Sequence, residues 1–536
     1  MIGLELVVVL GAVIVVCGLL GRRLHVADPV LLLLAGALLG FVPALRDVHL
    51  PPELMLLVFL PALLYWESLT ASLREIRANL RGIVLTSTLL VVLTAAAVAT
   101  AAHALGIDWG PAWVLGAAVA PTDATAVAAL ARLLPRRTVA VLRAESLVND
   151  GTALVLYGVA VGVTVGDETL GATHVTWLFV LAYGGGIAVG ALVAWLGARA
   201  RAVITDPLLA NTVMLLIPFT AFLLAELIEA SGVLAVVVCG LAMSQVGPRT
   251  VRADTRRQST AFWSLATFLL NAALFVLVGL EAQSAVRSLV SADLTAALVG
   301  VAVVCAVIVS VRLSFLVVSA YTIRLIDRRP QQLLRRVSNR TRVVSTVAGF
   351  RGAVSLAAAL AVPTSISSGA PFPDRDLIVF ITAGVVATTL VVQGLLLPMT
   401  VRWAHLPSDD RLVHERQLAD ESATEAALDA LPEIAADLGT DAEVVDRMHT
   451  ELTEHLQVLQ AQDGDSADRE DAAELDAAAR LDEQYTSLRL ALIGRKRATV
   501  VRLRDERRID DAVLRRVQAR LDLEEVRLSR GDLVED

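Results

Sequence analysis

A strip of polar and ionisable residues interrupts an otherwise apolar run at residues 139–165. The run contains Glu145, Ser146, Asn149 and Asp150. At 3.6 residues per turn, Ser146 and Asp150 share one face of a helix, and Glu145 and Asn149 lie beside them. Two carboxylates, a hydroxyl and an amide in apolar surroundings need cations or protons as partners, because an isolated charge there is costly. The spacing therefore predicts a site for such ions.

A second polar group lies in the apolar run 111–134, where Pro121, Thr122 and Asp123 follow one another. Proline has no N–H and clashes with the preceding turn, so it frees backbone carbonyls nearby. At membrane depth, free carbonyls are tolerated only where they line a cavity or bind something. The Thr122 hydroxyl and the Asp123 carboxylate add oxygens, which hard cations prefer. A broken helix with an oxygen-rich end is predicted, and the alternative is a proline kink filled by a water.

Five further ionisable residues lie inside apolar runs or close to their ends. Arg312 and Arg351 lie well inside two late runs, so the buried bases follow the buried acids along the chain. Glu67, Glu226 and Glu229 lie near the ends of earlier runs. For these three, a misplaced boundary or a side chain that reaches the interface explains the charge equally well.

The composition of the chain is that of a membrane protein. Of its 536 residues, 56% are apolar and only 19% are charged, whereas soluble domains are about 45–50% apolar and about 25% charged. The apolar residues form runs near the length that spans a bilayer. An all-α polytopic membrane protein is therefore predicted, with about thirteen spans at 2–20, 29–45, 52–72, 80–103, 111–134, 139–165, 174–198, 208–229, 232–247, 260–281, 294–323, 343–363 and 376–400. The spans that begin at 208 and 232 meet at Ser231-Gly232, as a tight hairpin or as one broken element.

Arginine is distributed unevenly between the loops that would join these spans. One alternating set of loops holds 22 arginines and the other holds 3, and the alternation stays in phase through all thirteen runs. Because basic loops stay in the cytoplasm, we expect the N-terminus outside, the C-terminus in the cytoplasm, and the protein in the cell membrane.

A polar tail follows the apolar body, which divides the chain into residues 1–403 and 404–536. The tail carries 33 acidic and 18 basic residues. Helices are expected over 411–438, 441–461 and 468–528. The tail is either a solvated helical appendage, or a regulatory or dimer-stabilising module whose basic block contacts acidic helices or anionic lipid.

Several classes of function are disfavoured by what the sequence lacks. No basic stripe with interleaved aromatic residues indicates nucleic acid, and no glycine-rich phosphate loop is present. The three cysteines lie far apart without metal-ligand spacing. No cofactor is expected. A membrane enzyme that uses the buried carboxylates is disfavoured too, because the runs contain no nucleophile motif.

The polar motifs occur together in an order that resembles a known family. The chain is similar, over residues 1–403, to the bacterial sodium/proton antiporter branch of the first monovalent cation:proton antiporter family, relatives of the animal sodium/hydrogen exchangers. The motifs that carry the resemblance are Leu-Pro-Ala-Leu-Leu-Tyr-Trp-Glu67, Ala-Pro121-Thr-Asp123-Ala, Glu145-Ser-Leu-Val-Asn-Asp150-Gly, Ala225-Glu226 with Ser231-Gly-Val-Leu-Ala-Val, and Phe350-Arg-Gly-Ala-Val-Ser355.

The resemblance implies an architecture and a transport cycle. It implies thirteen spans with inverted repeats, two crossed broken helices and a homodimer in the bilayer. A six-helix core would move as an elevator against a dimerisation half. The transported ions would be Na+, with Li+ or K+ as options, and H+. Such exchange would serve pH and sodium homeostasis.

The resemblance also implies roles for individual residues. Asp150 would alternately hold the cation and the proton, and the rest of the site would come from Ser146, Thr122, Asp123, Glu67 and Asn149. Glu145 would be held in an ion pair by Arg312, and Arg351 would offset the charge where helix ends face each other. The sequence leaves open which of the two arginines reaches Glu145.

The charges predict the stoichiometry of exchange. Asn149-Asp150 stands where electrogenic relatives carry two consecutive aspartates. If an arginine neutralises Glu145, a single free carboxylate remains, and it can hold one proton or one monovalent cation. Electroneutral one-for-one exchange is therefore expected. A potassium-selective exchanger or a cation channel on the same scaffold is the alternative.

Overall fold

The structure is a computed structural model, which divides into two units, Met1–Ser408 and Asp409–Asp536. Each unit is treated by itself below. The structure describes residues 2–24, 27–42, 55–123, 134–166, 172–204, 206–250, 253–288, 294–326, 338–406 and 411–461, together with short pieces at 492–496, 498–500, 502, 506, 517 and 521–525.

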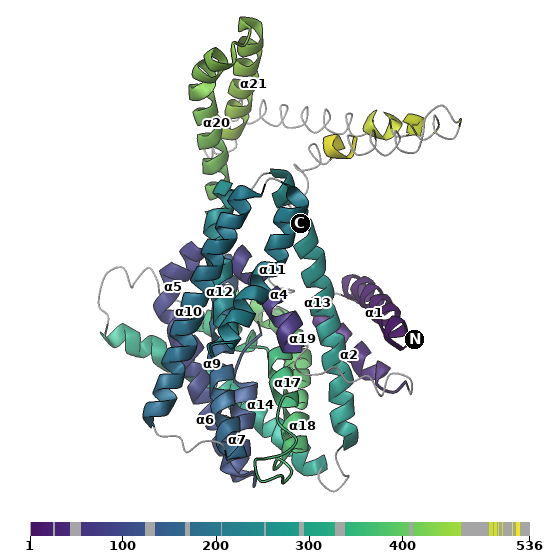
Figure 1. The fold of residues 1–536 in the computed structure, drawn as a ribbon, viewed down its shortest axis with the longest axis vertical. Helices are drawn as coiled ribbons and strands as arrows, with labels where there is room; N and C mark the ends of the chain where they lie inside the picture. The colour runs from purple at the N-terminus through teal and green to yellow at the C-terminus, as the bar shows by residue number, and fades with distance from the viewer. Residues whose placement is uncertain are drawn as a thin grey trace. The chain divides into compact units, whose positions relative to one another are not determined.

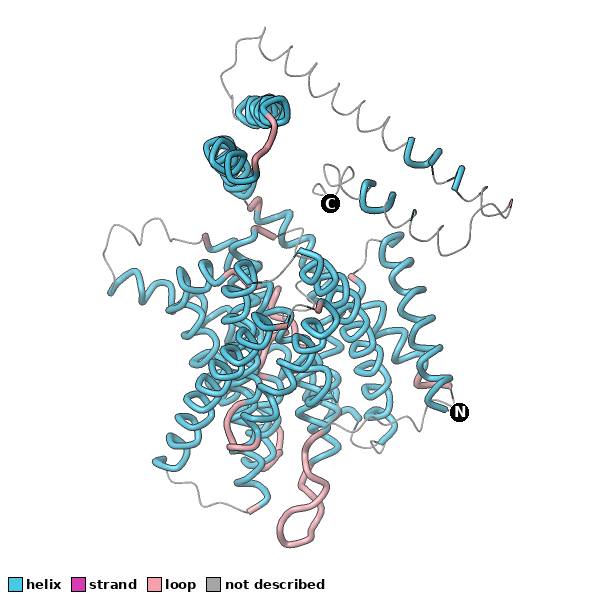
Figure 2. Tube along the Cα trace, turned by 45° about the horizontal axis from the view of Figure 1, so that its top comes forward, coloured by secondary structure: helices cyan, strands magenta, loops and turns pink. Residues whose placement is uncertain are grey.

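The described part of the first unit is helical, without a named strand (Figures 1 and 2). Each of the thirteen apolar runs contains helix. The elements are α1 (Ile2–Leu24), α2 (Asp28–Leu39), η2 (Met55–Phe59), α4 (Leu60–Thr70), α5 (Leu73–Leu85), η3 (Thr86–Leu90), α6 (Val91–Ala104), α7 (Trp109–Val119), α9 (Arg136–Val165), α10 (Ala172–Val203), α11 (Pro207–Glu226), α12 (Gly232–Thr250), α13 (Ala253–Ser288), α14 (Leu294–Ile326), α16 (Asn339–Val347), α17 (Ala353–Leu360), α18 (Arg375–Thr388), η5 (Thr389–Gln393) and α19 (Gly394–Ala404).

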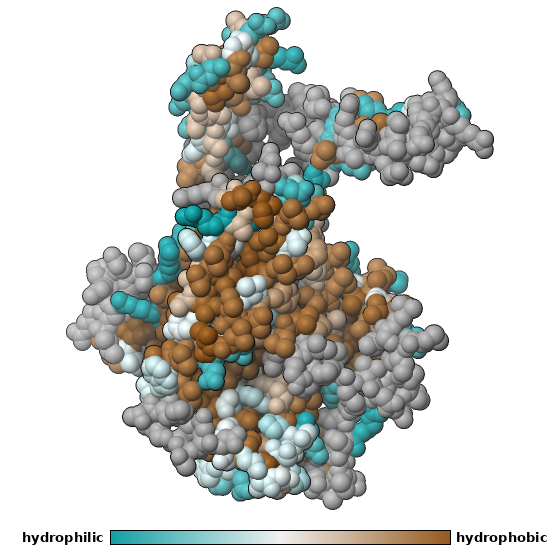
Figure 3. Space-filling view, viewed as in Figure 1, coloured by the Kyte–Doolittle hydropathy of each residue, from teal (hydrophilic) through white to brown (hydrophobic). Residues whose placement is uncertain are grey.

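Length and composition suit these helices to a bilayer. Among the described residues, eight helical stretches are long and apolar enough to span a membrane, and four shorter apolar helices accompany them. The visible face of the first unit is mostly apolar (Figure 3), and large apolar side chains such as Trp177 and Trp195 of α10 are exposed on its surface. Such a surface is stable in contact with lipid, whereas its exposure to water costs free energy. The predicted class, an all-α polytopic membrane protein, is confirmed, while the count of thirteen spans stays a prediction.

Local sequence signals explain where several helices begin and end. The Asp206 carboxylate accepts hydrogen bonds from the backbone N–H groups of Leu208 and Leu209 at 2.8 and 3.0 Å, and Pro207 occupies the first turn of α11. These are the preferred residues at a helix start. At the other end of α9, Gly166 adopts a φ of 89° and terminates the helix, as glycine commonly does.

The chain between α11 and α12 forms a tight hairpin, one of the two arrangements that the sequence allowed. It turns through residues 227–231, and α10, α11 and α12 pack side by side (Figure 1). The backbone N–H of Ser231 donates to the carbonyl of Ala182 on α10 at 3.1 Å. Glu226 and Glu229 are exposed at this turn, outside the cavity described below.

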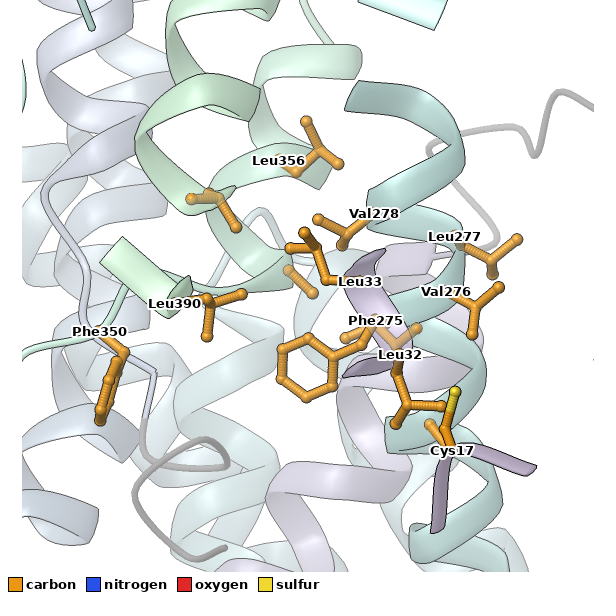
Figure 4. Packing of buried hydrophobic residues seen from close by; sticks show 14 of the residues in the cluster. Cys17, Leu32, Leu33, Phe275, Val276, Leu277, Val278, Phe350, Leu356 and Leu390 are labelled. Carbon is orange, nitrogen blue, oxygen red and sulfur yellow. The ribbon is translucent and has the colours of Figure 1, made fainter. Parts of the chain in front are cut away.

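Small residues allow two helices of the first unit to approach closely. A Cβ added at Gly36 of α2 would overlap the carbonyl oxygen of Val276 on α13, and one at Gly279 would overlap the carbonyl oxygen of Leu33. Around this contact lies an apolar cluster that includes Leu33, Phe275 and Leu356 (Figure 4). Close packing of this kind is typical of helices within a bilayer, and it fixes α13, which forms one wall of the site.

Two spans have unwound segments, and these segments meet. Helix α7 ends at Val119 and residues 120–123 are not helical, while residues 348–352 separate α16 from α17. The backbone N–H of Asp123 donates to the carbonyl of Phe350 at 2.9 Å, so the two unwound segments lie against each other. The predicted pair of crossed broken helices is therefore confirmed. The continuation of the first broken span, residues 124–133, lies outside the described residues.

The longest described segment of the second unit forms two helices, and its short described pieces at 492–496, 498–500 and 521–525 are helical too. The two helices are α20 (Arg411–Leu438) and α21 (Ala442–Ala461), close to the expected helices at 411–438 and 441–461. Gly439 allows the turn between them, because its φ of 63° is left-handed. Most of the expected helix over 468–528 lies outside the described residues. The regulatory role of the tail and the division at residue 404 stay predictions.

Candidate functional site

A small cavity lies where the broken spans meet α4, α9 and α13. Its volume of about 50 Å³ is enough for a few water molecules. Much of the lining is apolar. The polar side chains that line it come from five parts of the chain, and they are Glu67, Thr122, Asp123, Ser146, Asp150, Asn271 and Ser355.

Helix α9 holds the unwound segment through its polar strip. The hydroxyl of Ser146 donates to the backbone carbonyl of Thr122 at 2.9 Å, and the amide of Asn149 donates to the hydroxyl of Thr122 at 2.7 Å. All three side chains are buried. Two hydrogen bonds from adjacent turns of a rigid helix therefore fix Thr122, whose own hydroxyl proton stays available to another acceptor.

Asp123 is placed against the beginning of α17. A Cβ on Gly352 would overlap the Asp123 carboxylate, so only glycine allows this approach. Gly352 is the N-cap of α17, where the partial positive charge of a helix end favours a nearby carboxylate. The N-terminal end of α17, which faces the cavity, therefore lies against the carboxylate of Asp123 from the other broken span.

Asp150 lies in this cavity without a basic partner among the residues that the structure describes. Its side chain is 5% exposed. The charged groups that act on it are two other acids, Asp123 and Glu67, and both line the same cavity. A buried carboxylate with acidic neighbours is expensive unless it binds a cation or a proton.

Glu145 lies on the same helix but is paired. One of its carboxylate oxygens accepts from Nη1 of Arg312 at 2.5 Å, and both residues are 3% exposed. The Nε of Arg312 also donates to the carbonyl of Ser345 at 3.1 Å. Gly349 leaves room for this arginine, because a Cβ there would crowd its Cδ and Nε at 2.8 Å.

Arg351 lies within the unwound segment of the twelfth run, where the charges of Arg312 and Glu145 both act on it. Its guanidinium donates to the carbonyl of Gly349 at 3.3 Å, and its backbone N–H donates to the hydroxyl of Thr389 at 3.3 Å. The side chain is 1% exposed. Of the two arginines that the sequence left open as partners of Glu145, the structure pairs Arg312.

Sequence reasoning missed a hydrogen-bond chain that supports α9 behind the site. The hydroxyl of Ser87, in the π-helix η3, donates to the carbonyl of Glu145 at 3.1 Å, and Thr152 donates to the carbonyl of Ser87 at 2.7 Å. The hydroxyl of Tyr183 on α10 lies 2.5 Å from that of Thr152. Hydroxyl residues are common in spans and η3 leaves no pattern in the sequence, so no signal could have found this chain.

Two residues of the cavity were also missed. Asn271 on α13 and Ser355 on α17 line it, and neither belongs to the predicted ligand set. A lone asparagine in the apolar run 260–281 was a usable signal, since polar residues in spans are rare and tend to be functional. Ser355 is the last residue of a motif already noted, but its type alone gave no reason to select it.

The arrangement defines a class of protein. Carboxylate, hydroxyl and carbonyl oxygens gather where two discontinuous helices meet inside a polytopic membrane unit, and such sites are typical of secondary transporters. Oxygen ligands around Asp150, which has no basic partner among the described residues, suit a hard monovalent cation or a proton. Among the described residues, no group of three or more His, Cys, Asp or Glu side chains is placed to hold a metal ion.

Comparison with known proteins gives the family. Residues 10–403 match the model of the family described as "Sodium/hydrogen exchanger, transmembrane". The chain belongs to this family of transporters, which confirms the resemblance found in the sequence.

Relatives are similar over most of the chain. An uncharacterized Na+/H+ exchanger of Mycobacterium tuberculosis is 46% identical over 528 residues, which cover 98% of this chain and 96% of the relative. A low-affinity Na+/H+ antiporter of Synechocystis is 30% identical over 385 residues, or 71% and 70% of the two chains. The solved structure of a sodium/proton antiporter of Methanocaldococcus jannaschii at pH 8 shares the fold, with a TM-score of 0.56 and 20% identity over 75% of this chain and 99% of that one.

Proposed function

We propose that this protein exchanges Na+ for H+ across the cell membrane, one for one and without net charge movement. Li+ and K+ are the other monovalent cations that the site could accept. One observation carries the proposal: of two buried carboxylates on α9, Glu145 is paired with Arg312, whereas Asp150 has no basic partner among the described residues. The names of the relatives from Mycobacterium and Synechocystis support sodium as the cation.

In this proposal Asp150 has two mutually exclusive occupants. Ionised, it binds a cation together with the oxygens of Ser146, Thr122, Asp123 and Glu67, which line the cavity, whereas Asn149 lies outside the lining and holds Thr122. Protonated, it is neutral and releases the cation. Each occupied form of the site carries the same charge, because the proton and the cation each add one positive charge to the same carboxylate. The exchange is then driven by the two ion gradients alone.

Alternating access requires the site to face each side of the membrane in turn. We propose that the broken spans and α9 move together, as an elevator, against a half of the molecule that includes α10, α11 and α12 and that forms a homodimer. The N-terminus lies outside and the C-terminus in the cytoplasm, as the arginine distribution predicts. The physiological result is control of cytoplasmic pH and sodium.

Proteoliposomes test the stoichiometry. Purified protein is reconstituted in vesicles loaded with a pH-sensitive dye, and Na+-driven proton movement is recorded with a K+/valinomycin clamp at zero and at an imposed potential. The initial rate and the final pH are expected to be equal under both conditions. A final pH that follows the imposed potential would contradict one-for-one exchange. Vesicles without protein control for leakage.

The tail is proposed to be a regulatory or dimer-stabilising module. Its surface is charged and its described helices are mostly exposed. Deletion of residues 412–536 is expected to shift the pH response of exchange or to weaken assembly, as measured by dye assays and by size-exclusion chromatography with light scattering. If the deletion variant matches the full chain in both assays, the tail is only a solvated appendage.

A further inference from the structure

Two polar atoms at the cavity are buried and have no hydrogen-bond partner among the described residues. They are Oδ1 of Asn271, on α13, and the hydroxyl oxygen of Ser355, on α17. Both residues line the cavity that contains Asp150, and Ser355 is 1% exposed. A buried polar atom without a partner is costly, and such atoms in native proteins generally have a functional reason or hold a water or an ion.

The two residues lie on different walls of the cavity from the strip on α9. Asn271 belongs to α13, which also contributes Leu274 to the lining, and Ser355 belongs to the first turn of α17 beyond Gly352. The strip on α9 and the unwound segment at Thr122 and Asp123 supply the remaining polar side chains, apart from Glu67 on α4. An ion in a cavity this small is therefore within reach of oxygens from several directions.

Neutral oxygens are needed to complete the coordination of a cation in this cavity. Hard cations collect several oxygen ligands at once, and the carbonyl of Thr122 is already engaged by Ser146. We propose that Asn271 and Ser355 supply an amide oxygen and a hydroxyl oxygen to the transported cation. This assignment rests on the proposed cation/proton exchange and adds two ligands to its site.

The two occupants of Asp150 should depend on these ligands differently. A cation needs oxygens around it, whereas a proton forms a covalent bond to a single carboxylate oxygen. Loss of the Asn271 or Ser355 oxygen therefore weakens cation binding and leaves proton binding almost unchanged. A residue that only packs the helices would instead change the rate of exchange or the stability of the protein.

Matched variants separate these roles. Asn271→Leu removes the amide at nearly constant volume, and Ser355→Ala removes the hydroxyl. The controls are Asn211→Leu on α11 and Thr382→Val on α18, because each of these residues also has a buried oxygen with no partner in the described part of the chain but lies outside the cavity lining. Exchange is measured in proteoliposomes at an alkaline pH, where competition from protons is weak.

Each cavity variant is expected to raise the KM for Na+ by roughly 3- to 10-fold, the size of one lost interaction, while kcat stays within about twofold. Both controls should keep the wild-type KM. In a second assay, the thermal stabilisation of purified protein by NaCl, relative to choline chloride, should require correspondingly more salt for each cavity variant. Asn271→Ser, which keeps an oxygen, should lie between the wild type and Asn271→Leu in both assays.

The results that would overturn this assignment differ from the result that would overturn the proposed function. If the wild type exchanges cations for protons but both cavity variants keep its KM and its stabilisation by NaCl, the two oxygens hold water only and the assignment fails. A fall in kcat with unchanged KM would indicate packing and would also overturn it. If Asn271→Leu does not fold, the KM values of Asn271→Ser and Ser355→Ala still test whether the two oxygens bind the cation. Absence of cation-driven proton movement in the wild type would instead overturn the proposed function.

Discussion

Two carboxylates on α9 lie five residues apart and are buried to nearly the same extent, yet their surroundings differ. Glu145 is 3% exposed and pairs with Arg312 at 2.5 Å. Asp150 is 5% exposed and shares a cavity with Asp123 and Glu67. Burial alone therefore does not distinguish the two carboxylates. In the proposed mechanism, the presence or absence of a fixed counter-charge decides between a structural ion pair and an exchangeable site.

The largest effect is expected from removal of the charge at the unpaired acid. Asp150→Asn keeps the size of the side chain but can bind neither a proton nor a cation by charge. Exchange should fall by about 100-fold or more, to the background of empty vesicles, while the melting temperature of the purified protein stays at or above that of the wild type. The stability is expected to hold because a buried unpaired charge is removed. Dye-loaded proteoliposomes and thermal unfolding measure the two quantities.

Retention of exchange by Asp150→Asn would remove this residue from the mechanism. Loss of exchange together with aggregation would not test it, so elution of the variant at the wild-type volume in size-exclusion chromatography is the required control. A useful positive control is Asp150→Glu, which keeps the carboxylate and should retain part of the activity.

A different kind of effect is expected at the paired acid. Glu145→Gln leaves the guanidinium of Arg312 buried without its counter-charge. Breaking one partner of a buried ion pair typically costs about 3–5 kcal/mol. The variant should therefore lose thermal stability strongly, and whatever protein remains folded should still exchange cations for protons. Thermal unfolding in detergent, combined with the rate of exchange per folded protein, separates the two consequences.

Removing both partners sharpens the comparison and gives the smallest expected effect. Glu145→Leu combined with Arg312→Met leaves no unpaired charge, and such replacements are often close to neutral. The double variant should be more stable than Glu145→Gln alone. If the double variant folds well but has no exchange activity, the ion pair takes part in transport and the contrast between the two acids is wrong.

The sequence predicted much of the site because its signals are local. Ser146 and Asp150 share a helical face by spacing alone with Asn149 beside them, and Pro121 indicated the broken span. The pairing of Glu145 was not predictable in this way. It depends on a tertiary contact with a helix 167 residues further along the chain, and on the space that Gly349 leaves for Arg312.

Other parts of the site depend on three-dimensional packing that leaves no local pattern. The π-helix η3 directs Ser87 toward α9, and nothing in the run 80–103 distinguishes this hydroxyl from those of the threonines around it. Asn271 is visible as an isolated polar residue, but only the packing of α13 places it at the cavity. The direction of a side chain in a span follows from its neighbours, which a single sequence does not give.

The central claim is that one carboxylate exchanges a proton for a cation. The most direct measurement is proton release from purified protein in detergent and weak buffer, followed with a pH dye as NaCl is added, with choline chloride as the control for ionic strength. At a pH where exchange occurs, the account predicts release that saturates at no more than about one proton per chain, and none from Asp150→Asn. Release of two protons per chain, or equal release from the wild type and Asp150→Asn, would contradict it.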